Sequence, residues 1–391
     1  CKDISIELFE QLLIKSMYKN SNNRNLLIIT DGFANTAASV LESFKNINNI
    51  DALAFYPYDG TNAVQRLQMN TKFQDNINVC AVRGSADDIQ MRIKDIFKGS
   101  KINELLEDLN IIPLIIDSRN LSVIIAQVVY YFSAYCDLMN SGEIDYEEEK
   151  VNIVIPQDDL CNVLSAYYAK QMGLPVNKII CASNVNNAVT EFINTGFFNK
   201  NRKLKTTVSP FMDILQPYNL ERLIYHLSND DTNKVQEIFE CIENKGYYKA
   251  DKDIKSMIDS LFFAGYCSDS ETKETIKMMY DVENYLCDPH TAVAINVYEK
   301  YINKTKDTDT PTIIVSTENP YKFSNVVLES LKVKSYDGEL GFEDVDKLFS
   351  VTQKPIPQFI NDLRDKPIIS KNICNKDSIE DVLYGLMSKL R

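Results

Sequence analysis

Short apolar segments recur along this chain, and helical patterns lie between most of them. Each segment is about as long as a typical strand and is rich in branched apolar side chains. Strands that alternate with helices predict an α/β fold with parallel or mixed sheets covered by helices. The candidate strands are residues 26–30, 52–56, 77–82, 112–116, 151–155, 178–182 and 312–316. The expected helices are residues 35–45, 61–70, 85–98, 120–139, 160–172 and 185–195.

The pattern changes twice in the second half of the chain. It is mostly helical from about 219 to 303, where Asp288 and Pro289 are a suitable cap and first residue for a helix. It weakens after residue 335. The chain of 391 residues is long enough for two or three domains. The expected domains are a smaller α/β domain over 1–117, a larger α/β domain with a helical insertion over 118–335, and a helical C-terminal appendage over 336–391.

The charge balance limits the possible partners. A net charge of −13 disfavours nucleic acid and anionic membranes, because like charges repel. No apolar run is long enough to span a bilayer, and the first residues, CKDISIELFEQLL, do not resemble a signal peptide. We therefore expect no nucleic-acid or membrane partner, and a phosphorylated substrate would need locally placed lysine or arginine.

The cysteines and histidines point away from metal chemistry. The nine cysteines are scattered, form no CxxC pair and mostly have apolar neighbours. This predicts buried, reduced thiols in a cytoplasmic protein. With only His226 and His290 in the chain, a histidine-rich metal site or an HExxH helix is excluded.

One strand, turn and helix stands out. The sequence VNIVIPQDDLCNVLSAYYAKQMGLP begins at residue 151 with an apolar strand and continues into a helix. This arrangement often binds a phosphate through the free N–H groups of the helix. The turn from Pro156 to Asn162 nevertheless contains no glycine, in a chain with only 12 glycines, and it carries Asp158 and Asp159.

Long stretches of the chain resemble the threonine synthases. They include the segment from IVIPQDDLCN to NNAVTEF, and also SPFMDILQPYNLERLIYHLS, YLCDPHTAVAINVYEKY, STENPYKF, FYPYDGTNAVQRLQM and AQVVYYF. The resemblance covers nearly the whole chain. It implies two sheets in the fold-type II arrangement of enzymes that use pyridoxal 5'-phosphate (PLP), similar to the tryptophan synthase β subunit.

The resemblance also implies a reaction. Threonine synthases convert O-phospho-L-homoserine and water to L-threonine and phosphate, with PLP bound to a lysine as the electron sink. The family lysine lies in an FKD signature that matches Cys1-Lys2-Asp3, so Lys2 falls on the Schiff-base position. The resemblance thus makes Lys2 the catalytic candidate and the smaller domain the one that carries it.

Two further motifs concern the substrate. The family turn SGDTG matches Phe33 to Ala37, which gives Asn35 and Thr36 as substrate-binding candidates. Both glycines are alanine here, and a helix start capped by Asn35 also explains these residues. The family motif NSANSIN matches Leu114 to Asn120, which gives Ser118 and Asn120.

The remaining motifs concern the cofactor. The family turn SGNFGN binds the PLP phosphate and matches Gln157, Asp158, Asp159, Leu160, Cys161 and Asn162, of which only Asn162 is retained. In STENPYKF, Thr317 matches the hydroxyl that meets the pyridine nitrogen, although it is equally explained as a residue at a strand end. His290 matches the family and is expected to be structural.

Two hypotheses follow. The first is a threonine synthase-like enzyme that uses PLP and an amino-acid phosphate and is impaired by its altered motifs. The second is a catalytically inactive relative that forms a homo-oligomer or pairs with a true threonine synthase. The turn from Gln157 to Asn162 separates them, because a carboxylate placed about 4 Å from a phosphate charge costs roughly 4 kcal/mol at an effective dielectric constant of 20.

Overall fold

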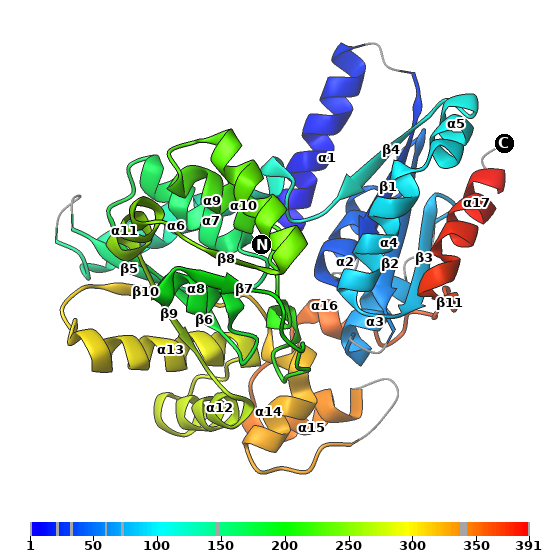
Figure 1. Ribbon diagram of the computed structural model, residues 1–391. Coiled ribbons are helices and arrows are strands. Elements are labelled where there is room, and N and C mark those ends of the chain that lie inside the picture. The colour runs from blue at the N-terminus through cyan, green and yellow to red at the C-terminus, as the bar shows by residue number, and fades with distance from the viewer. Residues whose placement is uncertain are drawn as a thin grey trace. The chain divides into compact units, whose positions relative to one another are not determined.

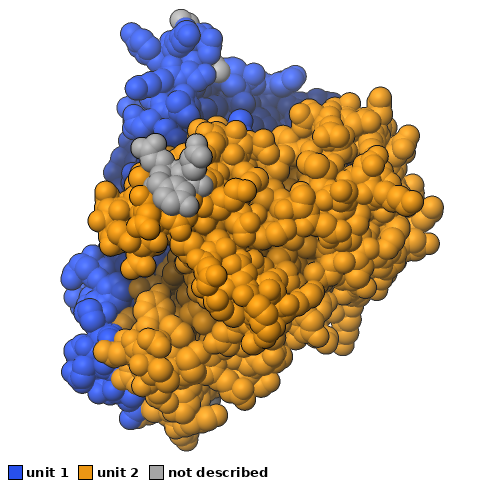
Figure 2. All heavy atoms as spheres, turned by 90° about the vertical axis from the view of Figure 1, so that its left-hand side faces the viewer, with its two compact units in different colours: residues 1–123, 337–391 blue, residues 124–336 orange. Residues whose placement is uncertain are grey.

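The computed structural model divides the chain into two compact units. Unit 1 comprises residues 1–123 and 337–391, and unit 2 comprises residues 124–336 (Figure 2). The structure describes residues 2–20, 23–31, 34–58, 61–71, 74–145, 149–336 and 342–389. The C-terminal segment, expected as an appendage of its own, instead supplies a strand and helices to unit 1. Local sequence cannot reveal this arrangement, because the pairing joins residues far apart in the chain.

Unit 1 is built on a five-stranded parallel sheet with the strand order β11-β3-β2-β1-β4 (Figure 1). The strands are β1 (Asn25–Asp31), β2 (Ile50–Pro57), β3 (Ile77–Arg83), β4 (Ile111–Ile116) and β11 (Ile373–Asn375). The helices are α1 (Lys2–Lys19), α2 (Ala34–Ser43), α3 (Ala63–Asn70), α4 (Ala86–Lys98), α5 (Ser100–Asp108), α15 (Phe342–Thr352), α16 (Gln358–Asn361) and α17 (Ile379–Lys389), with a 3₁₀ turn η3 (Lys376–Ser378).

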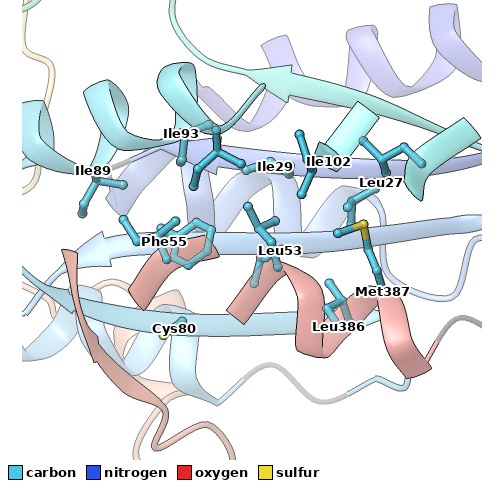
Figure 3. Packing of buried hydrophobic residues seen from close by; sticks show 14 of the residues in the cluster. Leu27, Ile29, Leu53, Phe55, Cys80, Ile89, Ile93, Ile102, Leu386 and Met387 are labelled. Carbon is cyan, nitrogen blue, oxygen red and sulfur yellow. The ribbon is translucent and has the colours of Figure 1, made fainter. Parts of the chain in front are cut away.

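The two faces of this sheet are covered by different helices because successive strand residues point to opposite sides. Leu27, Leu53 and Phe55 point to one face, where α4, α5 and α17 pack (Figure 3). Ile89 and Leu383 are among the helix residues that complete this cluster. Helix α2 packs on the other face against β1 and β2, with α1 and α3 beside it. The expected α/β architecture is therefore confirmed in this unit.

Unit 2 contains a four-stranded parallel sheet with the order β10-β5-β6-β9, and a two-stranded antiparallel ribbon of β7 and β8. The strands are β5 (Val151–Pro156), β6 (Val176–Ser183), β7 (Phe197–Asn199), β8 (Tyr247–Lys249), β9 (Phe262–Tyr266) and β10 (Thr312–Ile314). The helices are α7 (Cys161–Gln171), α8 (Ala188–Thr195), α9 (Leu220–Leu227), α10 (Thr232–Lys245), α11 (Lys252–Leu261), α12 (Asp269–Glu283), α13 (Pro289–Thr305) and α14 (Ser324–Ser330), with 3₁₀ turns η1 (Pro210–Met212) and η2 (Pro320–Phe323).

Strand β9 was not expected, because it lies inside a region whose pattern is mostly helical. Its five residues pair in parallel with β6, with Ile179 opposite Phe262. Helix α13 covers one face of the sheet, where Val293 and Val297 pack against Val154 and neighbouring strand residues. Helices α7 and α8 contact β5, β6 and β9. The sheet is therefore a parallel sheet with helices packed on it, as the strand–helix alternation predicts.

Helix α6 (Leu121–Ser141) links the two units and is long and apolar enough, by length and composition alone, to cross a membrane. Its contacts are those of a packed helix. The Tyr131 hydroxyl donates to the Asn162 carbonyl at 2.8 Å, and the Ser165 hydroxyl donates to the Ile124 carbonyl at 3.0 Å. These hydrogen bonds join α6 to α7, whereas Ile125 and Val129 on α6 are 50% and 65% exposed.

The expected start of α13 and the start of α12, which was not predicted, both have clear caps. Asp288 accepts hydrogen bonds from the N–H groups of His290 and Thr291 at the start of α13, and Pro289 is the first helical residue. At the start of α12, Ser268 and Glu271 cap each other reciprocally. Such caps satisfy N–H groups that lack partners within the helix.

We expect Leu383→Ala to lower the free energy of unfolding of unit 1 by about 2–4 kcal/mol, because truncating a fully buried leucine removes apolar contacts and leaves a cavity. Ser388→Ala on the same helix is the matched control, since Ser388 is exposed. Urea denaturation followed by circular dichroism measures both changes. Equal effects of the two substitutions would contradict the packing of α17 described above.

The α12 cap predicts a pH dependence. Burial acts to raise the pKa of Glu271, but hydrogen bonds from Lys300 and Ser268 outweigh it and lower the pKa to about 2. The cap therefore stabilises the fold above the ordinary glutamate pKa of 4.5, and this contribution is lost as the pH falls from 4.5 towards 2. Because the Glu271 and Lys300 side chains are 37% and 38% exposed, solvent limits the contribution of this ion pair to less than about 1 kcal/mol.

Glu271→Gln should accordingly be less stable than the parent at pH 7 and equally stable near pH 2. Thermal unfolding measured across this pH range tests the prediction. Glu274→Gln, on the same helix, is the control and should leave the pH profile unchanged. A difference between parent and Glu271→Gln that is independent of pH would show that the charge of Glu271 is not involved.

Candidate functional site

The residues expected to form a site fall into two sets, one in each unit. Lys2, Asn35, Thr36, Ser118 and Asn120 belong to unit 1, whereas the turn 157–162 and Thr317 belong to unit 2. Apart from Lys2, which begins α1 ahead of β1, they follow the carboxyl ends of parallel strands, the edge at which open α/β sheets bind ligands. Because β5 pairs with β10, the turn and Thr317 emerge from neighbouring strands. Because β1 pairs with β4, Thr36 and Asn120 do the same.

The turn after β5 keeps a conformation that ordinarily favours glycine. The Gln157 N–H donates to the Ala182 carbonyl at 2.7 Å, which ties the turn to β6. Leu160 then has φ 65° and ψ 9°, in the left-handed region, with its side chain fully buried. A left-handed backbone costs a residue with a Cβ roughly 1–2 kcal/mol, which the burial of the leucine side chain offsets.

The start of α7 is occupied by the chain's own carboxylates. Asp159 is 3% exposed, and its Oδ1 accepts a hydrogen bond from the Cys161 N–H at 3.0 Å. The Asp158 Oδ2 accepts from the Asn162 Nδ2 at 3.1 Å. A carboxylate at this position satisfies a free N–H group and complements the helix dipole. The anion that a helix start attracts is therefore supplied within the turn.

The opposite side of the turn is closed by α6. The Tyr131 hydroxyl donates to Asn162, and the Cys161 Sγ lies 3.7 Å from the Gln127 Oε1. Burial raises the pKa of Tyr131 well above its ordinary value, and the nearby Cys161 and Asp158 raise it further. The tyrosine therefore remains a neutral hydrogen-bond donor that holds the turn against α6.

These observations test whether a PLP phosphate fits the turn. A phosphate would have to replace the Asp159 carboxylate at the Cys161 N–H and would lie beside a second carboxylate on Asp158. At about 4 Å, each carboxylate would oppose the phosphate by roughly 4 kcal/mol at an effective dielectric constant of 20. The residues from Gln157 to Asn162 therefore do not fit the phosphate group of PLP in this conformation.

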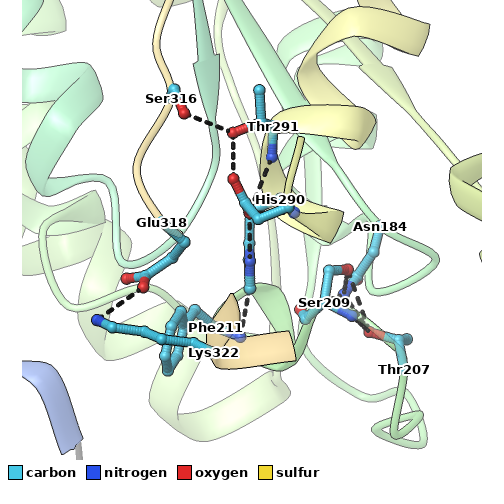
Figure 4. A network of polar contacts seen from close by, with 10 residues as sticks. Asn184, Thr207, Ser209, Phe211, His290, Thr291, Ser316, Glu318 and Lys322 are labelled. Atoms are coloured by element: carbon cyan, nitrogen blue, oxygen red, sulfur yellow. Dashed lines mark hydrogen bonds and ion pairs between the residues drawn. The ribbon is translucent and has the colours of Figure 1, made fainter. Parts of the chain in front are cut away.

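A network of polar side chains holds the loop after β6 in one conformation. This network was not identified from the sequence. The Asn184 Nδ2 donates to Asp213 at 2.9 Å. It also lies 2.8 Å from the Thr207 hydroxyl, to which it donates (Figure 4). Asn186 also donates to Asp213 at 2.9 Å. Burial raises the pKa of Asp213, although hydrogen bonds from Thr207 and Asn184 act to lower it. The asparagine-rich sequence NVNN, residues 184–187 directly after β6, is the signal that could have revealed this network.

His290 lies in a second buried cluster near the same edge. Its ring is 1% exposed, stacks on Phe211 with centroids 4.9 Å apart, and accepts a hydrogen bond from the Phe211 N–H at Nε2 (Figure 4). Its Nδ1 lies 3.2 Å from the Asp288 carboxylate. Burial would raise the pKa of Asp288, but hydrogen bonds from His290 and Thr291 outweigh it and lower the pKa. Both ring nitrogens thus make contacts within the fold, in accord with a structural role.

The conformation of the segment that contains Thr317 is fixed by contacts among the residues that follow it. Thr317 is half-buried and follows β10, and Glu318 forms an ion pair with Lys322 at 3.1 Å. The Asn319 side chain accepts from the Tyr321 N–H at 3.0 Å and so caps η2. Thr317 therefore has the position expected at a strand end, and its cofactor role stays a prediction.

In unit 1, only part of the expected site can be described. Lys2 begins α1 and Asn35 lies in the first turn of α2, but their side chains are outside the described residues, as is Phe33. Thr36 is described and is buried in α2. The roles of Lys2 and Asn35 stay predictions.

The turn after β4 is held by its own side chains. The Asn120 Oδ1 accepts from the Asp117 N–H at 2.7 Å, and Asp117 pairs with Arg119. Ser118 is buried beside them. The amide oxygen of Asn120 is therefore used to shape the loop, and the substrate-binding roles of Thr36, Ser118 and Asn120 stay predictions.

Comparison with known proteins places these features in a family. The family model "Threonine synthase, C-terminal" matches residues 291–382. The human protein "Threonine synthase-like 1" is 34% identical over 340 residues, which cover 85% of this chain and 45% of that protein. The threonine synthase of Saccharomyces cerevisiae is 29% identical over 378 residues, which cover 90% of this chain and 71% of that protein. The chain spans about half the length of the first of these relatives.

Solved structures show the same fold. A threonine synthase from Brucella melitensis, described as PLP-bound, matches with a TM-score of 0.82 and 24% identity, over 100% of this chain and 76% of that one. The yeast threonine synthase matches with a TM-score of 0.80 and 25% identity, over 99% of this chain and 76% of that one. The fold is therefore that of the fold-type II PLP enzymes, and the chain belongs to the threonine synthase family.

Proposed function

We propose that this chain is a threonine synthase-like protein in which the family reaction is impaired. In that reaction, O-phospho-L-homoserine and water give L-threonine and phosphate with PLP as cofactor. The observation that carries the proposal is the Asp159 carboxylate on the Cys161 N–H at the start of α7. The helix start that would hold the cofactor phosphate is already neutralised, so the turn no longer attracts a dianion.

The residues around the turn also bear on the proposal, because they hold the loops of the scaffold in place. The Asn184–Asp213 network and the His290–Phe211 cluster are buried and well paired. Such networks specify one conformation of the loops at the carboxyl edge of the sheet. A chain that keeps these supports while placing carboxylates in the phosphate turn retains the scaffold and alters its ligand chemistry.

The second candidate is a catalytically inactive protein that binds a partner, either another copy of this chain or a true threonine synthase. It is favoured by α1, where Ile4, Leu8 and Leu12 are 58%, 38% and 53% exposed. These residues are four positions apart and form one apolar stripe on the helix. Under either candidate, we propose a cytoplasmic protein without nucleic-acid or membrane partners.

The first test is an absorbance titration of the purified protein with PLP, with Lys2→Ala as the matched variant. We expect no visible Schiff-base band that depends on Lys2, because the phosphate of the cofactor is not held. A band that appears in the parent and disappears in Lys2→Ala would overturn the proposal. Turnover of O-phospho-L-homoserine would then be the measurement to make next.

The charge of Asp159 can be separated from its capping role. Asp159→Ala should lower the free energy of unfolding by about 1 kcal/mol. Asp159→Asn should change it by only a few tenths of a kcal/mol, because the asparagine side chain can also accept the hydrogen bond at the helix start. Asp159→Asn should bind inorganic phosphate at least about tenfold more tightly than the parent, because one opposing charge is removed.

Asp231→Asn is the matched control for this pair. Asp231 caps α10 in the same unit by accepting from the Lys234 N–H at 3.0 Å. Its substitution should leave phosphate binding, measured by titration calorimetry, unchanged. If Asp159→Asn and Asp231→Asn affect phosphate binding equally, the turn is not the element that excludes phosphate.

A further inference from the structure

A cavity of about 500 Å³ lies in unit 1, beside the edge of the sheet where β11 pairs with β3. Where the structure describes the residues assigned above to catalysis or cofactor binding, none of them lines this cavity. Its walls come from β2, β3, β11 and α17, together with residues just before β11. Two cysteines from distant parts of the chain, Cys80 and Cys374, meet in its lining. The cavity is thus separate from the proposed function and does not depend on it.

The two thiols form a hydrogen-bonded pair. Their Sγ atoms are 3.5 Å apart, with Cys80 as the donor. Cys80 on β3 is 2% exposed (Figure 3), whereas Cys374 on the edge strand is half-buried and reaches the cavity. The hydrogen bond from Cys80 lowers the pKa of Cys374, although burial opposes this change. The same hydrogen bond, with burial, raises the pKa of Cys80. Cys374 is therefore the sulfur that ionises more easily.

The charged and polar groups around the cavity favour an anion. Lys371 and Lys389 line it, and the described residues of its lining include no aspartate or glutamate. This composition is unusual in a chain with a net charge of −13. The Nδ2 atom of Asn78, also in the lining, is buried without a hydrogen-bond partner among the described residues. A buried donor of this kind suits an acceptor such as a carboxylate oxygen.

The strand register determines whether Cys80 and Cys374 can form a disulfide with each other. Cys374 lies opposite Val82 in the parallel pairing of β11 with β3, so Cys80 is displaced from it by two residues. Diagonal neighbours in a sheet have Cα atoms about 7–8 Å apart, beyond the roughly 7 Å that a disulfide bridges without backbone movement. The arrangement therefore favours reaction of Cys374 with an external partner, with Cys80 as a positioning residue.

We propose that this cavity is a modification site, where Cys374 undergoes thiol–disulfide exchange with a small disulfide that carries carboxylates. The Cys374 thiolate attacks one sulfur of the disulfide, a new S–S bond forms to Cys374, and the old S–S bond breaks. The second half leaves as a thiolate and takes a proton from solvent. The disulfide is the oxidant, and the lysines and Asn78 bind its carboxylates. A free thiol reverses the reaction by the same exchange.

The test exposes the reduced, full-length protein to glutathione disulfide, which is anionic, and in parallel to cystamine, which is cationic. Peptide mapping by mass spectrometry measures the rate of adduct formation at each cysteine. Cys136 on α6 is the internal control, because it is exposed. We expect glutathione disulfide to modify Cys374 at least about tenfold faster than Cys136, since reactivity follows thiolate character as well as exposure.

The charge and positioning roles are tested by variants. Lys371→Glu with Lys389→Glu should reverse the preference, so that cystamine reacts with Cys374 faster than glutathione disulfide does. Cys80→Ala should slow the reaction by about tenfold, and Cys80→Ser, which keeps a donor, should restore much of the rate. A merely structural role for Cys80 would not give this rescue.

Three results would overturn the proposal. One is modification of Cys136 as fast as that of Cys374 in the parent protein, which requires no variant to fold. Another is a parent protein that reacts faster with cystamine than with glutathione disulfide. The third is an internal disulfide between Cys80 and Cys374 in place of the adduct, which would show that the cavity does not take the external molecule.

Discussion

Parallel strand pairing is the constraint on which both units depend. A parallel sheet needs helices over its faces, and it brings the carboxyl ends of all its strands to one edge. The helices therefore supply the buried apolar core, while the loops at the edge collect the polar side chains. The turn after β5, the asparagine loop after β6 and the segment after β10 are neighbours for this reason, although more than 100 residues separate the first from the last.

At that edge, the turn after β5 has a backbone conformation that favours glycine, but it carries carboxylates of its own. Leu160 still holds a left-handed backbone, as a glycine would, and α7 still begins directly after it. The positive end of the helix dipole is met by Asp159. Under our proposal, the turn keeps the backbone path of the family's anion site while a carboxylate of the chain takes the place of the anion. Fold similarity alone is a poor guide to activity in such a case.

Much of the fold follows from sequence pattern. Runs such as LLIIT and VNIVI match β1 and β5, and the Asp288-Pro289 pair marks the start of α13. Strands β9 and β11 escaped prediction, because their short segments gain strand character only by pairing with β6 and β3. Motif matching located the turn at 157–162, but not the partners of its carboxylates. The Asn184–Asp213 network escaped because hydrogen bonds between separate loops leave no periodic signal.

The placement of β11 and α17 has a consequence for how the chain folds during synthesis. Unit 2 is one continuous segment, whereas the sheet of unit 1 has its edge strand about 290 residues after the neighbouring β3. A ribosome releases β1 to β4 early, yet the apolar face beneath α17 stays uncovered until α17 itself emerges. Unit 2 can therefore complete its core first, and the early strands of unit 1 must wait with an open edge, the condition in which chaperones bind nascent chains.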